Sequence, residues 1–306
     1  MPRMIFGVVV AGLAGVEALH VGARASVAPV PRTANVRMQA TTQVQSLLTK
    51  NKFLVDSLAS SAPDMSEMSR LRFAMQFPDA AEAKAKIAET VAWRAGEGKS
   101  IVESAAKAVA EATAGGGWDN EPVRLAAPHA ATINQFITPK NIVSLSTDDG
   151  DLVYVIRASQ INDKEMMSKV SVDQFCEFLL YVKEVHQLVV NANSLRTGRL
   201  CNVIFANDIT GTRQAPDPLF GKALSQSSKS YESLYPSLAG PTLILNLPFI
   251  LQAFVALFKP LFPKSVQARL KFEGAPFLKK LDDLTPLTED PASRKAFLAE
   301  VEGLLA

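Results

Sequence analysis

An apolar stretch near the C-terminal end limits the fold of this chain more than any other feature. Its first part, residues 242–247 (TLILNL), is a short apolar run between two prolines. Such a run is typical of a strand that is buried on both faces. Residues 249–262 then predict a helix whose apolar side chains cover more than one face, with Gln252 and Lys259 as its strongly polar residues. A helix of this kind needs apolar surroundings on most of its sides.

Two other interpretations of the same stretch stay open at this point. Residues 240–262 carry one charged side chain, and their length approaches the roughly 20 residues that cross a bilayer. The three prolines among them argue against a continuous membrane-spanning helix. The stretch also fits a buried core helix whose one lysine reaches the surface with its ammonium group.

Short motifs on both sides of the stretch favour a different interpretation. They are residues 235–236 (YP), 246–248 (NLP), 258–260 (FKP) and 271–274 (KFEG). Their order resembles the CRAL-TRIO domain of the phosphatidylinositol transfer proteins of the secretory pathway. The resemblance implies an α/β sandwich in which helices cover a mostly parallel sheet, preceded by a small helical domain. It also implies that residues 249–262 form a mobile gate helix over a pocket for a single lipid or other hydrophobic molecule.

The resemblance assigns roles to individual residues. In members that bind phosphatidylinositol, a glutamate nine residues before the tyrosine of YP and the lysine of Phe-Lys-Pro contact the inositol headgroup. Here the lysine is Lys259, but the glutamate position holds Gln226, which lacks the charge-assisted hydrogen bonding of a carboxylate. Val203 and Phe205 stand where phosphatidylcholine-binding members carry hydroxyl residues, and we include Tyr231 in the ligand-binding set. The residues assigned to the gate helix are Phe249, Phe254, Leu257, Phe258, Leu261 and Phe262.

Motifs upstream resemble the same family. Residues 71–73 (LRF), with a later helix that ends in Trp93-Arg94, resemble the small helical domain that precedes CRAL-TRIO domains. The chain departs from many phosphoinositide-binding relatives here, because residues 74–76 (AMQ) replace their basic residues. Residues 149–154 (DGDLVY) resemble the family's Asp-Gly-x-x-Val-Tyr entry to a strand, and residues 208–211 (DITG) resemble the turn after its central strand.

Local patterns predict the elements that carry these motifs. Asp79 and Ser171 are predicted helix N-caps, the second for a long helix with apolar side chains at helical spacing. Residues 219–234 predict a further helix, while residues 152–158 and 201–209 have the composition of strands. Strands and helices that alternate at these lengths indicate an α/β fold with a mostly parallel sheet.

The N-terminal residues have the composition of a targeting sequence. Arg3 precedes an apolar run at residues 4–16, which is too short to cross a bilayer, and residues 23–25 (ARA) suit cleavage of a signal peptide. No acidic residue occurs between positions 18 and 55, which is typical of a transit peptide. A signal peptide followed by such a segment resembles the bipartite presequence of proteins imported into complex algal plastids. An ordinary secretory signal and a mitochondrial presequence remain the alternatives.

These patterns divide the chain into four parts. Residues 1–38 are the predicted targeting presequence, residues 39–115 an N-terminal helical region, residues 116–285 the CRAL-TRIO lipid-binding domain and residues 286–306 a C-terminal helix. The presequence accounts for the net charge of +2, because the remainder holds 28 basic and 29 acidic side chains. A nearly neutral protein lacks the basic footprint of a nucleic-acid-binding protein. We therefore expect peripheral membrane contact through apolar surface, no nucleic acid, and a monomer.

Few residues offer catalytic or metal-binding chemistry. Cys176 and Cys201 fit buried thiols better than a disulfide framework. His129 and His186 lack the close Cys, His or Asp spacing of a zinc site, so we expect no metal and no cofactor besides a bound lipid. The sequence contains no GxSxG, HExxH or P-loop motif, which argues against an enzyme. A spatial triad that uses one of the two histidines stays open.

The predicted function is the binding of one lipid or other hydrophobic ligand, such as a phospholipid, in an apolar pocket. The protein would transfer that ligand or present it at membranes. A lipid-sensing regulatory or scaffold module without transfer activity is the alternative, because carrier and sensor share the same pocket.

Overall fold

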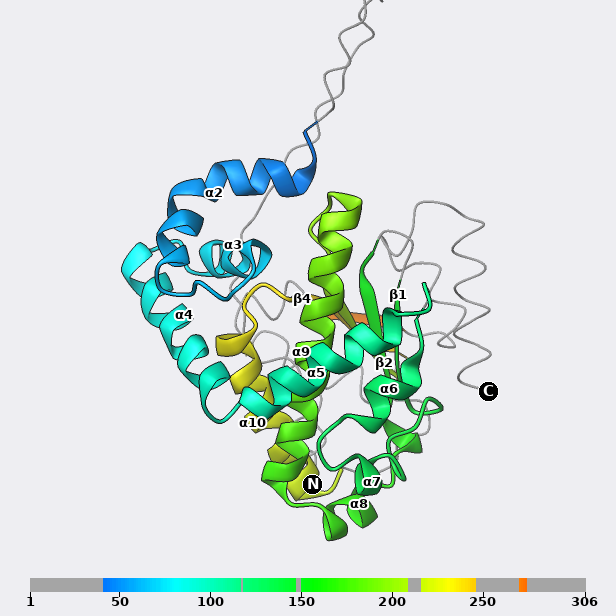
Figure 1. Cartoon of the computed structure of the whole chain (residues 1–306). Coiled ribbons are helices and arrows are strands. Elements are labelled where there is room, and N and C mark those ends of the chain that lie inside the picture. The colour runs from blue at the N-terminus through cyan, green and yellow to red at the C-terminus, as the bar shows by residue number, and fades with distance from the viewer. Residues whose placement is uncertain (1–40, 117, 147–149, 209–215, 246–269, 274–306) are drawn as a thin grey trace, which may run out of the picture.

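The computed structural model describes residues 41–116, 118–146, 150–208, 216–245 and 270–273 (Figure 1). The predicted targeting presequence, the predicted gate helix with Lys259 and the predicted C-terminal helix lie outside the described residues. The described α-helices are α2 (Gln43–Ala59), α3 (Glu67–Gln76), α4 (Ala80–Ala95), α5 (Lys99–Thr113), α6 (Asn120–Leu125), α7 (Ala130–Ile133), α8 (Asp163–Lys169), α9 (Val172–Thr197) and α10 (Pro218–Leu234). The described strands are β1 (Ile142–Ser146), β2 (Leu152–Arg157), β3 (Val203–Asp208), β4 (Ala239–Leu245) and β5 (Leu270–Glu273), and a short 3-10 helix covers Ala158–Gln160.

The first three described helices pack around a core of their own. Asp79 caps α4 as predicted, and its carboxylate accepts hydrogen bonds from the backbone of the first turn. Apolar side chains of all three helices face inward, among them Leu58, Leu71, Phe73 and Ile87, which are nearly inaccessible to solvent. They form one hydrophobic cluster that unites α2, α3 and α4.

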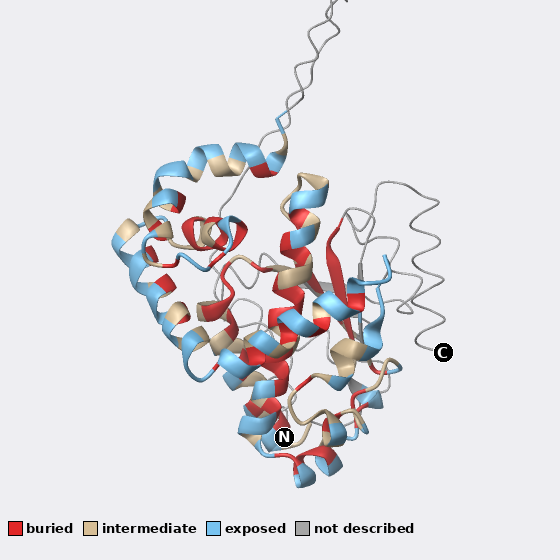
Figure 2. Ribbon diagram, viewed as in Figure 1, coloured by how far each residue is buried: buried red, intermediate tan, exposed pale blue. Residues whose placement is uncertain are grey.

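Helix α9 is the longest described helix and the centre of the second, larger core (Figures 1 and 2). Ser171 and Gln174 form a capping box at its start, which confirms the predicted N-cap. It ends at Gly198, whose φ of 70° is easily adopted by glycine. Helix α5 packs on α9, and Ala105 and Ala108 at this contact allow the two backbones to approach closely.

The five described strands form one sheet in the order β1-β2-β3-β4-β5. Strand β1 pairs with β2 in the antiparallel direction, and the other neighbours are parallel. The predicted α/β class and mostly parallel sheet are therefore confirmed. The sequence patterns predicted β2, β3 and β4 but neither β1 nor β5. Both missed strands are short and mix polar with apolar residues, so their pairing with neighbours, and not their local pattern, defines them.

Helices α9 and α10 pack on one face of this sheet. The ring of Tyr154 on β2 lies 4.9 Å from that of His186 on α9, and the ring of Phe205 on β3 lies 6.1 Å from that of Tyr231 on α10. The strand residues that alternate with Tyr154 on β2 and with Phe205 on β3 point to the opposite face. Those with described side chains are small or aliphatic and buried, and they belong to neither described core cluster: Val153, Val155, Ile204 and Ala206.

Two arginines, of which Arg72 is buried and Arg94 partly buried, join the N-terminal helices to the rest of the molecule. Arg94 on α4 makes a bidentate ion pair with Glu184 on α9, with both N–O distances at 2.8 Å. Arg72 on α3 donates to the side chain of Asn191 at 2.8 Å and to the backbone carbonyls of Cys201 at 2.7 Å and Ser237 at 2.6 Å. These bonds fix α3 and α4 against α9 and the beginnings of β3 and β4.

Among the helices that the structure describes, none combines the length and the apolar character that crossing a membrane requires.

Candidate ligand-binding site

Three of the residues predicted to bind ligand lie on the helix-covered face of the sheet. Val203 and Phe205 occupy alternate positions on β3 and so point to the same face. Val203 is fully buried, while Phe205 is partly exposed and packs edge-on against Tyr231 of α10. The structure thus brings Phe205 and Tyr231 into contact, although 26 residues separate them in the sequence.

The other predicted headgroup residues are not brought together in the described residues. Gln226 lies on the exposed side of α10, where its backbone carbonyl accepts a hydrogen bond from the Ser230 hydroxyl at 3.3 Å. Lys259 and the six residues assigned to the gate helix lie outside the described residues. Their roles stay predictions.

A continuous row of rings runs across this face of the sheet, and we call it the aromatic row. It begins with His186 and Tyr154, and the Tyr154 ring lies 5.9 Å from the Phe205 ring. Beyond Phe205, the Tyr231 ring lies 5.9 Å from that of Tyr235, which itself contacts Trp93 of α4 at 6.5 Å. Because most neighbouring rings meet edge to face or tilted, the row combines large apolar area with defined geometry.

Lys183 places a cation beside the aromatic row. Its Nζ lies 4.9 Å from the centre of the Tyr231 ring, so the lysine sits between α9 and α10. Burial lowers the pKa of Lys183 to about 8, an effect that the neighbouring Cys176 partly offsets. No described carboxylate forms an ion pair with this lysine. Lys183 was not predicted as a site residue, and its only signal in the sequence is a basic residue directly after the apolar run at residues 178–182 (FLLYV).

His186 and Ser144 form the one described pair that resembles a base and a nucleophile. The Ser144 Oγ and the His186 Nε2 are 2.7 Å apart. Burial, together with the charge of Lys183, lowers the pKa of His186 to about 3, so the imidazole is a weak base. No described carboxylate hydrogen-bonds to this imidazole to orient it, as a catalytic triad requires. The pair therefore fits a hydrogen bond that satisfies a buried histidine.

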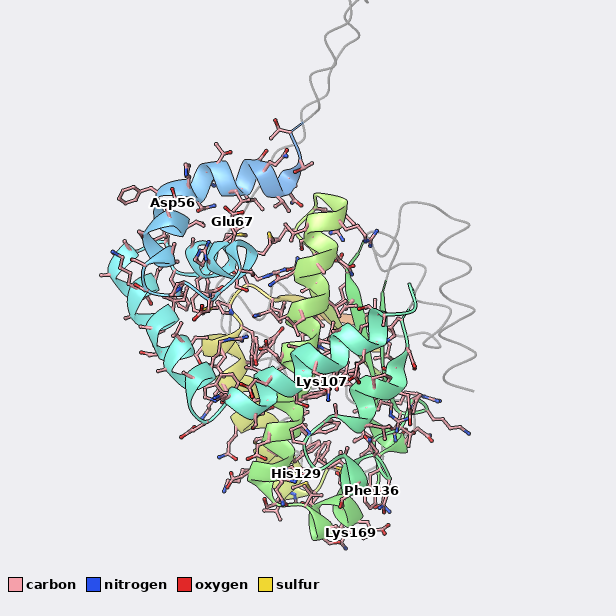
Figure 3. The ribbon with its side chains drawn as sticks, in the orientation of Figure 1. Asp56, Glu67, Lys107, His129, Phe136 and Lys169 are labelled. Atoms are coloured by element: carbon pink, nitrogen blue, oxygen red, sulfur yellow. The ribbon has the colours of Figure 1, made fainter. Side chains whose placement is uncertain are left out.

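The remaining polar features offer no alternative reaction centre. His129 lies beside the lower part of α9, where it contacts the carboxylate of Glu177 at 2.6 Å at the protein surface (Figure 3). In the described part of the chain, no three His, Cys, Asp or Glu side chains come together as a metal site. A surface hollow on α5 and α6 is lined by Glu111, Asp119 and Glu121 beside a few apolar residues, and these carboxylates make it unsuitable for an acyl chain.

Both cysteines were predicted to be buried thiols, and the structure differs from this prediction at one of them. Cys201 is buried, as expected, but Cys176 is only partly buried and lies close enough to the Ala223 carbonyl for a weak hydrogen bond, at 3.4 Å. Both are free.

Comparison with known proteins identifies the family that has this arrangement. The sequence model of the CRAL/TRIO domain matches residues 138–291, which include every described strand and the helices α8, α9 and α10. The chain belongs to the CRAL/TRIO domain family. CRAL/TRIO domains bind lipids or other small hydrophobic molecules, in agreement with the apolar character of the aromatic row.

Solved structures support the same CRAL/TRIO fold. Thirty-one chains of known structure match this one, and one of them is the crystal structure of Sfh5. The two proteins are 12% identical, the TM-score is 0.51, and the similarity covers 79% of this chain and 83% of the other. This similarity concerns the fold. The search of curated protein sequences gives no match.

Proposed function

We propose that this protein binds one lipid or other hydrophobic molecule on the helix-covered face of its sheet and transfers or presents it at membranes. The observation that supports the proposal most directly is the contact between Phe205 and Tyr231. These rings place a large apolar surface where the central strand faces α10. Burial of an acyl chain against such a surface gains about 0.8 kcal/mol for each methylene group that leaves water.

The topology of the sheet supports a position for the predicted gate helix. Strands β2, β3, β4 and β5 are parallel neighbours in chain order. Crossover connections between parallel strands are almost always right-handed, so successive connections in this order run over the same face. The first two connections contain α9 and α10. The third contains residues 249–262, so the same rule supports our proposal that the predicted gate helix closes this face of the sheet.

This arrangement gives each part of the predicted site a task. The aromatic row forms the apolar wall, and the predicted gate helix closes the pocket in solution. An apolar gate is costly to open in water but opens readily at a membrane surface, where its side chains enter the lipid. Lys259 and Gln226 would then meet the polar head of the ligand, since parallel sheets bind ligands near the carboxyl ends of their strands.

A vesicle transfer assay with the full chain tests this function. The double variant Phe254→Asp/Phe258→Asp is expected to abolish lipid pickup, because two carboxylates in the gate cannot pack against an acyl chain. The control is Phe53→Asp, at a side chain that is 85% exposed on α2, which should keep normal pickup. Normal pickup by the double variant would contradict the gate assignment.

The same assay separates a carrier from a sensor. A carrier moves labelled lipid from donor to acceptor vesicles at a rate that rises with protein concentration. A lipid sensor takes up the label but does not deliver it. Delivery would support the carrier function, and uptake alone would support the sensor or scaffold alternative.

We also propose that residues 1–38 direct the protein to a plastid. The support is the signal-like run followed by a segment without acidic residues. A fluorescent protein fused behind residues 1–38 should enter complex plastids when expressed in an alga that contains them. Delivery to the secretory pathway or to mitochondria would contradict this proposal and support the corresponding alternative.

A further inference from the structure

We propose that Lys183 binds the negatively charged head of the ligand, so that the preferred lipid carries a phosphate or carboxylate group. This inference rests on the proposed lipid-binding function and specifies the chemistry of its ligand. The lysine lies on α9, away from the predicted gate helix in the sequence, and would form a second cationic contact in addition to the predicted one at Lys259.

The position of Lys183 supports this role. Its ammonium lies over the face of the Tyr231 ring, and the same ring contacts Phe205 on the central strand. The cation therefore borders the apolar surface that we assign to the ligand. A lipid whose chain lay along the aromatic row would bring its polar end within reach of a group at this border.

The lack of a counter-charge is the second observation. Three other cations that are partly or fully buried have strong partners in this structure: Arg94 pairs with Glu184, Arg199 contacts Asp151 at 2.6 Å, and Arg72 donates to three oxygens. Lys183 has no carboxylate or carbonyl partner among the described residues. A cation held in apolar surroundings without a partner reduces stability. An anionic ligand would supply the missing charge.

The residues that face Lys183 do not supply that charge. The contacting group from α10 is the ring of Tyr231, which offers only a cation–π interaction. Cys176 and His186, its charge-sensitive neighbours on α9, are both neutral near pH 7, because burial raises the pKa of the thiol and lowers that of the imidazole. The ammonium is a compact point charge, which suits either a phosphate or a carboxylate.

Lipid uptake from vesicles by the full chain tests the inference. The probes are phosphatidylglycerol for a phosphate head, oleate for a carboxylate head and diacylglycerol for a neutral head, each labelled and offered in phosphatidylcholine vesicles. Lys183→Met should weaken uptake of at least one anionic probe by about tenfold or more, the loss of one charged hydrogen bond. Uptake of diacylglycerol should not change. Lys183→Arg should recover most of the anionic uptake, and Lys229→Met, at an exposed lysine of α10, should behave like the original protein.

The outcomes distinguish this inference from the function on which it rests. Loss confined to phosphatidylglycerol assigns a phosphate head, and loss confined to oleate assigns a carboxylate head. Equal uptake of all probes by Lys183→Met and the original protein, or an equal loss of all three, would overturn the inference and leave lipid binding intact. If the original protein takes up none of the probes, the proposed function fails as well.

Thermal unfolding provides an independent readout. Lys183→Met removes an unpaired charge and keeps a side chain of similar length, so its Tm should equal or exceed that of the original protein. A variant that binds anionic lipid poorly but folds as well as the original protein has lost a binding group. A clear fall in Tm would show that the lysine is structural and would overturn the inference.

Discussion

At the scale of single residues, Gly150 is a position where both the backbone conformation and the close packing require glycine. Gly150 precedes β2 with a φ of 91°, a backbone conformation that other residues rarely adopt. A Cβ atom at this position would lie 2.9 Å from the Cys201 sulfur and 3.1 Å from the Cβ of Asn193. The turn into β2 therefore packs directly on the C-terminal part of α9 and on the residues just before β3.

Gly150→Ala is expected to lower the free energy of unfolding by about 1–3 kcal/mol, because strain and a steric clash combine at this site. Urea denaturation measures the change. The matched control is Gly115→Ala, where the added Cβ meets no atom within 4 Å. That variant should be neutral or slightly stabilised, and equal losses in the two variants would contradict this account of Gly150.

The pKa of Lys183 predicts how ligand binding depends on pH. The group is charged below its pKa of about 8 and neutral above it, while Cys176 and His186 are neutral near pH 7. Uptake of phosphatidylglycerol, whose phosphodiester charge is fixed, should therefore fall as the pH rises through 8 and beyond. The decline should be absent in Lys183→Met. A parallel decline in both proteins would assign the effect to another group.

At the scale of elements, α9 organises the molecule because it contacts the N-terminal helices, α10 and the sheet. Its ion pair with α4 has a fully buried carboxylate, that of Glu184. Burial alone would lower the pKa of Arg94, but the hydrogen bonds and charge of Glu184 outweigh this effect and raise the pKa, so the guanidinium stays charged near pH 7. Loss of one partner leaves the other charge buried without compensation.

Glu184→Gln should lower the free energy of unfolding by about 3 kcal/mol, since it breaks a buried ion pair on one side only. The exposed pair between Lys52 and Asp56 provides the control, because Asp56→Asn should cause a much smaller loss than Glu184→Gln. Chemical denaturation of both variants measures the difference. Similar small losses would show that the pair between α4 and α9 contributes little.

Much of the fold could be predicted at the scale of elements. Capping residues and apolar spacing gave the starts of α4 and α9, since both signals are local in the sequence. Strands β1 and β5 escaped prediction because their partners, and not their own residues, stabilise them. Phe205 and Tyr231 were each predicted as ligand-binding residues, but their contact with each other was not predicted. The unpaired state of Lys183 depends on every charge around it in space, so no sequence pattern could reveal it.

At the scale of the whole molecule, Arg72 connects the core of the N-terminal helices with the larger core around α9. It is almost completely buried, and its guanidinium reaches α9 and the backbone that leads into β3 and β4. Burial lowers its pKa to about 10, which still leaves the group charged near pH 7. The Leu-Arg-Phe motif resembles that of the family's helical domain, but the motif alone does not predict the contacts that its arginine makes.

Arg72→Met is expected to lower the free energy of unfolding by about 3 kcal/mol or more, because three acceptors, two of them buried and one partly buried, lose their donor. Arg196→Met, at an exposed arginine of α9, is the control and should be nearly neutral. Hydrogen exchange should show that α2, α3 and α4 open before the sheet in the Arg72 variant. Uniform opening would mean that the two cores do not depend on this arginine for their connection.

The central claim is that the chain carries one lipid with an anionic head. Native mass spectrometry of the purified full chain tests it most directly, because the mass of the complex shows whether a ligand is bound and the released ligand can then be identified. We predict one ligand per chain, with a phosphate or carboxylate group, and a lower occupancy in Lys183→Met. A chain that is purified empty and stays empty after incubation with vesicles of phosphatidylcholine and phosphatidylglycerol would contradict the account.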